Sequence, residues 1–250
     1  MEASDAQVEQ SGGPAPHDVL GRLTHGSLEV RGRLLDASNA SLYCTVTWRD
    51  ETSACIYKPR IGERPLWDFP TGTLSQRELA AYLISEWLGW GIVPPTVWRD
   101  GPYGPGMVQH WVDVDETVDL VELVRSNRKS LRQMSVFDVV INNADRKGGH
   151  LLPTPSGRIY GIDHGVTFST EGKLRTLLWQ WMGERIPKDL LTALQNLSVC
   201  LREPKRRDEL MEYLAGDEVD ATISRIDTLL RTRRHPEPSE DWPALPWPPF

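Results

Sequence analysis

"VFDVVINNADRKGGHLL", residues 136–152, begins as an apolar helix and ends in a polar run. Two asparagines, Asp145, Arg146, Lys147 and His150 fall within nine residues, 142–150. Turns favour glycine, asparagine and aspartate for their backbone conformations, but they do not need two basic residues, an acid and an imidazole together. The polar run therefore predicts a functional site.

A second acid follows in "IYGIDHG" (159–165), directly after an apolar strand. Asp145 and Asp163 are eighteen residues apart, with a hairpin predicted around 154–157. A hairpin folds back on itself, so both acids are expected to face the space at its base. Paired carboxylates suit divalent-metal binding or general-base catalysis. The structural alternative is that each acid caps a turn.

The chain before this segment alternates, and the chain after it is helical. Short β-like runs at 27–35, 42–48, 54–58, 96–100 and 106–112 surround one clear helix. In that helix, Ser75 and Glu78 have capping-box spacing. Helical patterns follow at 117–126, 130–142, 174–183, 187–200, 204–215 and 217–233. The order predicts an α+β chain with a small antiparallel β-rich N-lobe over 21–113, including helix 74–90, and a mainly helical C-lobe over 114–235.

The two ends are expected to lie outside these lobes. Residues 1–20 have neither a basic nor an apolar signal region and predict a disordered leader. Residues 236–250 are rich in proline and tryptophan. They predict either an extended strap across the body or a loose tail.

Bulk composition narrows the partners. A net charge of −7 disfavours nucleic acid or an anionic membrane surface as the main partner. No apolar run is long enough to span a bilayer, which predicts no integral membrane association. Cys44 and Cys55 are expected on adjacent strands, where a bridge is conceivable, but three cysteines favour reduced thiols in a cytoplasmic protein.

"FDVVINNADRKGGHLL…IYGIDHG" resembles the catalytic segment of atypical kinases related to the phosphoinositide 3- and 4-kinases and to HipA-type bacterial kinases. Three upstream stretches agree in order and spacing: "ACIYKP", "SQRELAAYLISEWLGWGIVPPT" and "GMVQHWV". The resemblance covers roughly residues 24–200. It implies a two-lobed protein-kinase-like fold that binds ATP and a divalent metal, Mg or Mn, between the lobes.

The same resemblance assigns roles to individual residues. It implies that Lys58 grips the ATP phosphates, that Glu78 orients Lys58, and that Asp163 holds the metal. Asp145 would accept or orient the acceptor's proton, and Arg146 or Lys147 would neutralise charge on the transferring phosphate. The remaining nucleotide contacts would come from Ser38, Asn39 and Ser41 in the polar loop 35–41, and from Gln109 and Trp111 at the hinge.

Three positions depart from the family pattern. Lys147 stands where the family loop has histidine, His150 where it has the second metal-binding asparagine, and His164 where it has phenylalanine. An imidazole is an unusual ligand for magnesium, so His150 would bind a softer ion such as manganese, or contact phosphate as a donor.

The departures leave other functions open. One is a nucleotide-binding pseudokinase or scaffold, and another is a metal-dependent hydrolase that uses both acids with His150 and His164. The favoured function is ATP-dependent phosphoryl transfer to an unknown hydroxyl acceptor, a protein side chain or an inositol-like alcohol. Trp179 and Trp181 would form either an aromatic platform for that acceptor or part of the core.

Overall fold

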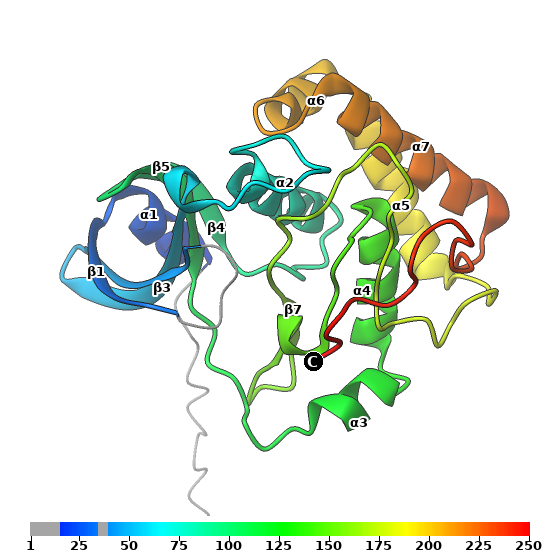
Figure 1. Cartoon of the computed structure of the whole chain (residues 1–250), viewed down its shortest axis with the longest axis horizontal. Coiled ribbons are helices and arrows are strands. Elements are labelled where there is room, and N and C mark those ends of the chain that lie inside the picture. Colours follow the sequence, from blue (N-terminus) through cyan, green and yellow to red (C-terminus); the bar gives the residue numbers. More distant parts are fainter. Residues whose placement is uncertain (1–15, 35–39) are drawn as a thin grey trace, which may run out of the picture.

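The computed structural model describes residues 16–34 and 40–250. Five antiparallel strands form one sheet in the order β1-β2-β3-β5-β4 (Figure 1). These are β1 (Ser27–Arg33), β2 (Leu42–Trp48), β3 (Glu51–Pro59), β4 (Thr96–Gly101) and β5 (Gly104–His110). The predicted strand set of the N-lobe is confirmed.

The β2–β3 connection is tighter than the five residues, 49–53, that separate the two strand-like runs predicted at 42–48 and 54–58. Only Arg49 and Asp50 separate the strands, and both have positive φ, 51° and 64°. Two-residue hairpin turns with positive φ at both positions match the right-handed twist of the flanking strands. As a result Cys44 pairs with Cys55 across the two strands, and all three cysteines are free.

Helix α1 (Pro16–His25) covers one face of the sheet. Val19 and Leu23 pack there against Cys44, Val46 and Val108. The prediction of a disordered leader over 1–20 is therefore wrong from Pro16 onward, and residues 1–15 lie outside the described part of the chain. Too few apolar positions precede the first strand to reveal the helix, whose stability comes from this packing.

Helix α2 (Leu74–Trp87) lies between the sheet and the C-lobe (Figure 1). The large apolar core that continues through the C-lobe helices includes Leu79 and Ile84 of α2, together with Leu88 directly after it. The helix ends three residues before the predicted boundary. Gly89 and Gly91 follow it with φ of 67° and 53°, a conformation that glycine adopts readily and that ends helices.

The C-lobe is mainly helical, as predicted. Its elements are α3 (Leu120–Arg125), α4 (Lys129–Val140), the hairpin β6 (Leu151–Pro153) and β7 (Ile159–Gly161), α5 (Lys188–Cys200), α6 (Pro204–Met211) and α7 (Gly216–Thr232). Short 3-10 turns occur at Arg60–Gly62 (η1) and Gly148–His150 (η2). No helix in the described part of the chain is long and apolar enough to cross a membrane.

The helix predicted over 174–183 does not form. The backbone N–H of Arg175 donates instead to the Asn143 carbonyl at 2.9 Å, and that of Thr176 donates to the Ala244 carbonyl at 3.1 Å. Long-range partners therefore take the hydrogen bonds that a helix would have made internally. One of those partners belongs to the segment 236–250, which crosses the C-lobe as the predicted strap (red in Figure 1).

Candidate active site between the lobes

Lys58, near the end of β3, joins both lobes through two carboxylates. Its Nζ donates to Glu78 Oε1 on α2 at 2.5 Å and to Asp163 Oδ1 after β7 at 2.9 Å. The Lys58 and Glu78 side chains are largely buried, whereas 40% of the Asp163 side chain is exposed. Three residues up to 105 positions apart thus form one charged group that opens on the side of Asp163.

Lys58 and Asp163 stabilise each other's charge, whereas burial raises the pKa of Glu78. Burial alone would lower the pKa of Lys58, but Asp163 and Glu78 outweigh it and hold that pKa above its ordinary value. In turn, Lys58 holds the pKa of Asp163 well below its usual range. Asp163 therefore stays ionised at any physiological pH.

Glu78 does not form the capping box with Ser75. The amide of Ser75 donates to Glu63 Oε1 at 2.8 Å, and the amide of Leu74 donates to Glu63 Oε2 at 3.0 Å. The Glu63 carboxylate thus occupies the positive end of the α2 dipole and satisfies the free N–H groups of its first turn. Glu78 is left to pair with Lys58.

The polar run after α4 is held by its two asparagines. Asn142 has φ of 50°, and its side-chain amide donates to the Ser169 carbonyl at 2.9 Å. The Asn143 side-chain oxygen accepts from the amide of Asp145 at 2.9 Å. The Asp145 carboxylate is in turn 3.1 Å from Lys147 Nζ. Asp145, Lys147 and Asp163 all line one cavity, so the structure brings the two acids to the same space.

Arg146 does not line this cavity, although Asp145 and Lys147 on either side of it do. Its guanidinium is fully buried and donates to Asp138 on α4 from Nε at 3.1 Å and from one terminal nitrogen at 2.9 Å. Asp138 also accepts from the Asn143 side-chain amide at 3.0 Å and from Thr176 Oγ1 at 3.0 Å. This placement contradicts a phosphate contact by Arg146, because no surface of its side chain reaches the cavity. Arg146 positions the loop.

Asp138 was missed by sequence reasoning. Its signal was present, because a carboxylate in the middle of "VFDVV" cannot be buried in an apolar helix without a charged partner. The identity of that partner required the fold.

His164 also turns inward. Its Nε2 accepts from Arg146 at 2.7 Å, and its ring meets Phe137 edge to face with 5.6 Å between the centroids. Burial, reinforced by the charge of Arg146, holds the pKa of His164 well below its ordinary value. The imidazole is thus a buried, uncharged ring that packs against the core. A metal site that combines His150 and His164 with the two acids is contradicted.

His150 remains beside Asp163, with 3.4 Å between Nε2 and the Asp163 Oδ2 atom. Burial lowers the pKa of His150, so the ring is neutral at neutral pH. Asp163 itself has φ of 60°, a left-handed conformation that is costly for a residue with a Cβ atom. With this backbone conformation the Asp163 carboxylate lies 2.9 Å from Lys58 Nζ and 3.4 Å from His150 Nε2.

Of the other residues expected to contact the nucleotide, Ser41, Gln109 and Trp111 lie in the described part of the chain. Ser38 and Asn39 lie outside the described residues, and Ser41 is buried beside β2. Gln109 is inside β5, where its side-chain amide donates to Thr96 Oγ1 at 2.9 Å, so this group is already engaged. Trp111 packs edge to face on Tyr43, with 5.1 Å between the ring centroids.

Cross-strand pairing identifies further residues on the face of the sheet that carries Lys58. Ile56 lies two residues before Lys58 on β3 and pairs with both Tyr43 and Gln109. Directly paired residues point to the same side of a sheet. Tyr43 and Ile56 therefore face the interlobe space. The alternation of β2 and β3 indicates that Tyr43 and Ile56 share one face of the sheet. That this face borders the site follows only from the fold, in which α1 covers the opposite face.

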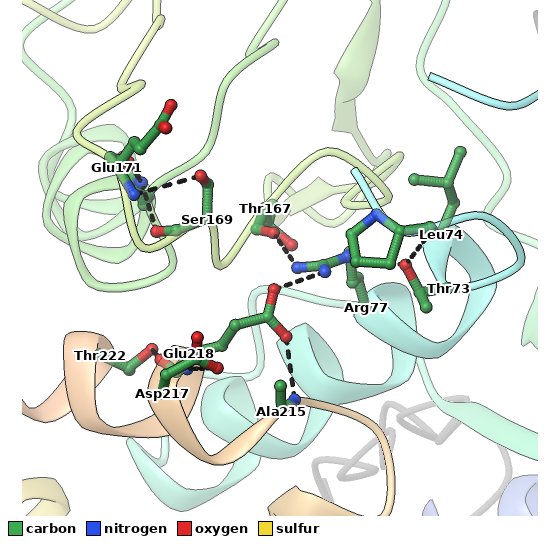
Figure 2. Close-up of polar contacts among 12 residues, drawn as sticks. Thr73, Leu74, Arg77, Thr167, Ser169, Glu171, Ala215, Asp217, Glu218 and Thr222 are labelled. Atoms are coloured by element: carbon green, nitrogen blue, oxygen red, sulfur yellow. Dashed lines mark hydrogen bonds and ion pairs between the residues drawn. The ribbon is translucent and has the colours of Figure 1, made fainter. Parts of the chain in front are cut away.

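Arg77, next to Glu78 on α2, ties this helix to the C-lobe (Figure 2). Its guanidinium donates to Glu218 on α7 at 2.5 Å and to the Thr167 carbonyl at 2.7 Å. Thr167 lies four residues after Asp163, so one buried arginine joins α2, α7 and the segment that carries the second acid. The pair Lys58–Glu78 depends on α2 being held in this place.

The residues present fit a magnesium or manganese ion shared with a nucleotide. Such ions are held by one or two carboxylates together with phosphate oxygens and water. Asp163 provides an ionised, partly exposed carboxylate, with His150 as its neutral neighbour. Among the described residues, no group of three or more histidine, cysteine, aspartate or glutamate side chains is arranged as a metal site formed by protein alone.

Comparison with known proteins agrees with this geometry. Residues 74–216 match the family model described as phosphatidylinositol 3- and 4-kinase. A Mycobacterium tuberculosis relative, Protein Rv2133c, is 42% identical over 91% of this chain and 94% of its own length.

Solved structures share the fold at low sequence identity. The Golgi casein kinase with Mn/ADP bound has a TM-score of 0.56 at 14% identity, covering 87% of this chain and 75% of the other. The structure of hydra Fam20 with sugar has a TM-score of 0.57 at 12% identity, covering 86% and 87%. The two-lobed kinase-like fold is thereby confirmed. The matched family model spans more than half of the 250 residues, and the chain belongs to the phosphatidylinositol 3- and 4-kinase family.

Proposed function

We propose that this protein transfers the γ-phosphoryl group of ATP to a hydroxyl group, with a divalent metal bound at Asp163. The observation that carries the proposal is the Lys58–Glu78–Asp163 group, in which a buried, fully charged lysine stands beside an ionised and partly exposed carboxylate. The family and the kinase-like fold support phosphoryl transfer in general. The bound Mn/ADP of one structural neighbour supports the choice of nucleotide and metal.

Phosphoryl transfer asks a protein mainly for positioning and charge neutralisation. In the proposed reaction, Lys58 turns from Asp163 to the phosphates while Glu78 keeps it in the cleft. Asp163, released from Lys58, would hold the divalent metal, whose positive charge would offset that of the phosphates. Glu78 and Asp163 therefore each have a partner both before and after ATP binds.

The acceptor is activated by Asp145. Its hydroxyl oxygen forms a bond to the γ-phosphorus as the bond between that phosphorus and the oxygen of ADP breaks, and the hydroxyl proton passes to the Asp145 carboxylate. Lys147, 3.1 Å from Asp145, lies on the same cavity and neutralises charge on the transferring group. Arg146 takes no direct part and holds the loop through Asp138.

Thermal unfolding with ATP plus Mg²⁺ or Mn²⁺ tests nucleotide binding. A ligand at about one hundred times its dissociation constant stabilises a protein by about 2.7 kcal/mol, so the midpoint should rise only when both ATP and metal are present. Asp163→Asn should abolish this rise. Lys129→Met, at an exposed ion pair of the C-lobe, is the control and should retain it.

Asp145→Asn separates catalysis from binding. This variant should keep the stabilisation by ATP and metal but lose roughly 10²–10⁴-fold in turnover, the usual effect of removing a general base. If the wild type is stabilised by ATP but never releases ADP, the protein is a nucleotide-binding pseudokinase. Stabilisation by metal alone, unaffected by ATP, would contradict the proposal.

A further inference from the structure

A cavity of about 470 Å³ opens beside the two acids. Its floor includes Asp145, Lys147 and Asp163, and its walls include three tryptophans, Trp67, Trp242 and Trp247. Small-molecule sites in proteins have volumes of roughly 300–1,000 Å³ and combine apolar walls with a few convergent polar groups. The cavity has the size and the composition of such a site.

The tryptophans come from segments outside the kinase motifs. Trp67 precedes α2, and Trp242 and Trp247 belong to the strap 236–250. Trp67 is 87% exposed and Trp247 is 85% exposed, although indole rings strongly favour burial. By contrast, Trp181 is buried in the core, and Trp179 donates from Nε1 to the Ala244 carbonyl. These two residues therefore do not form the aromatic platform that the sequence left open for them.

Lys173 lies close to two of these tryptophan rings. Lys173 Nζ lies 5.3 Å from the ring centroid of Trp67 and 5.2 Å from that of Trp242. Lys173 is itself buried and paired with Asp68 at 3.1 Å. Cations within about 6 Å of an aromatic face attract it. The loop before α2 and the strap therefore both contact the same charged group.

The strap is fixed against the catalytic loop. The amide of Gly148 donates to the Pro249 carbonyl at 2.9 Å, and the Phe250 ring lies directly against Gly148. A Cβ atom at position 148 would collide with that ring in its present position. The Ala244 carbonyl accepts from Thr176 and from Trp179. The strap forms a fixed wall that narrows the approach to Asp145.

The cations and acids that line the cavity are equal in number, Arg64, Lys147 and Arg175 against Asp68, Asp145 and Asp163. Among the described residues, Arg175 has no carboxylate partner: its guanidinium donates from Nε to the Ala144 carbonyl at 2.6 Å and lies 5.6 Å from the centroid of Trp242. A negatively charged group on a ligand would be attracted to this side.

We propose that Trp67, Trp242 and Trp247 bind the phosphoryl acceptor, and that the acceptor is a small, water-soluble hydroxylated molecule carrying a negative charge. Its apolar face stacks on the exposed indoles, its charge faces Arg175, and its hydroxyl reaches Asp145. A protein loop or a membrane lipid would have to pass the strap. This inference rests on the proposed phosphoryl transfer and specifies its acceptor.

The test follows the radiolabelled γ-phosphate of ATP after incubation with a bacterial cell extract. The extract is separated beforehand into protein, organic-solvent and small-molecule fractions. Label should appear in a water-soluble product of the small-molecule fraction. Passing that fraction through an anion exchanger before the reaction should remove the acceptor. Label only in protein or lipid, label unaffected by the exchanger, or no transfer by a protein that ATP stabilises would overturn the inference.

Variants connect the product to the walls. Trp67→Ala and Trp247→Ala should each raise the KM for the small-molecule fraction roughly tenfold, as expected for loss of one stacking partner. Both should keep the stabilisation by ATP and metal. Tyr103→Ala, an exposed aromatic residue on the β4–β5 turn outside the cavity, is the matched control and should change neither quantity. An unchanged KM in both tryptophan variants would also overturn the inference.

ATP binding keeps the two proposals apart. If ATP and metal fail to stabilise even the wild type, the phosphoryl-transfer proposal fails. If they stabilise the wild type and both tryptophan variants while the acceptor proves to be macromolecular, only the acceptor assignment fails.

Discussion

At the scale of the residue, the site rests on a buried carboxylate that contacts no substrate. Asp138 accepts hydrogen bonds from Arg146, Asn143 and Thr176, and both Asp138 and Arg146 are fully buried. Asp138→Asn keeps the shape but leaves the arginine charge uncompensated, which should lower the free energy of unfolding by roughly 3–5 kcal/mol. Urea unfolding at neutral pH measures this loss.

Asp189→Asn is the matched control for that change. Asp189 pairs with Lys129 at 2.7 Å, but both side chains are more than half exposed. Exposed ion pairs contribute roughly 0–1 kcal/mol, so this variant should unfold near the wild-type midpoint. Equal losses in the two variants would show that the Asp138 charge is not what holds Arg146.

At the scale of the element, α2 is held against the C-lobe by Arg77. Arg77→Met should leave Glu218 buried without its partner and loosen the helix that carries Glu78. We expect faster amide exchange in α2 and a several-fold weaker affinity for ATP, although Arg77 lies on the side of α2 that meets Glu218 and Thr167. Hydrogen exchange and ATP titration of the same sample measure both effects.

The pair between Arg207 on α6 and Asp220 on α7 provides the control for α2. It is 2.7 Å long and more exposed than the pair of Arg77 with Glu218, so Arg207→Met should change neither the amide exchange of α2 nor the affinity for ATP. The double variant Arg77→Met with Glu218→Leu should recover part of the lost stability, because no lone charge remains buried. Wild-type protection of the α2 amides from exchange in Arg77→Met would contradict the idea that Arg77 holds α2 in place.

At the scale of the whole molecule, buried histidines make stability depend on pH. His235, where the strap begins, accepts from Arg132 at 3.2 Å, and burial lowers its pKa from 6.5 to about 4. Below pH 6.5 the unfolded chain binds a proton that the folded chain refuses until about pH 4. The free energy of unfolding should therefore fall as the pH falls through this window, by about 3 kcal/mol at most from this residue.

The slope of stability against pH isolates His235. His235→Asn should reduce the slope of the free energy of unfolding against pH by up to the contribution of one proton, roughly 1.4 kcal/mol per pH unit between pH 4.5 and 6. His164 and His150, whose pKa values are also lowered, maintain a remaining slope. His25, exposed at the end of α1, serves as the control by His25→Asn. An identical slope in wild type and His235→Asn would contradict the assignment.

Sequence alone determined what depends on local patterns. Alternation along the first strands, the apolar period of α2 and the turn residues of the β6–β7 hairpin follow from backbone geometry within a few residues. Local patterns predicted that Asp145 and Asp163 lie close together, and the resemblance to atypical kinases implied that Lys58 and Glu78 join them. In the structure Lys58 donates to Glu78 and to Asp163.

Only the tertiary structure decided what depends on distant partners. Arg146 looks like a phosphate ligand until Asp138 is placed beside it, and the apolar pattern over 174–183 looks helical until Asn143 and Ala244 take its hydrogen bonds. Trp67 and Trp242 of the strap lie 175 residues apart in the chain, yet they line one cavity. Such contacts follow from the packing of the whole chain, because burial and pairing energies act between residues that no local window contains.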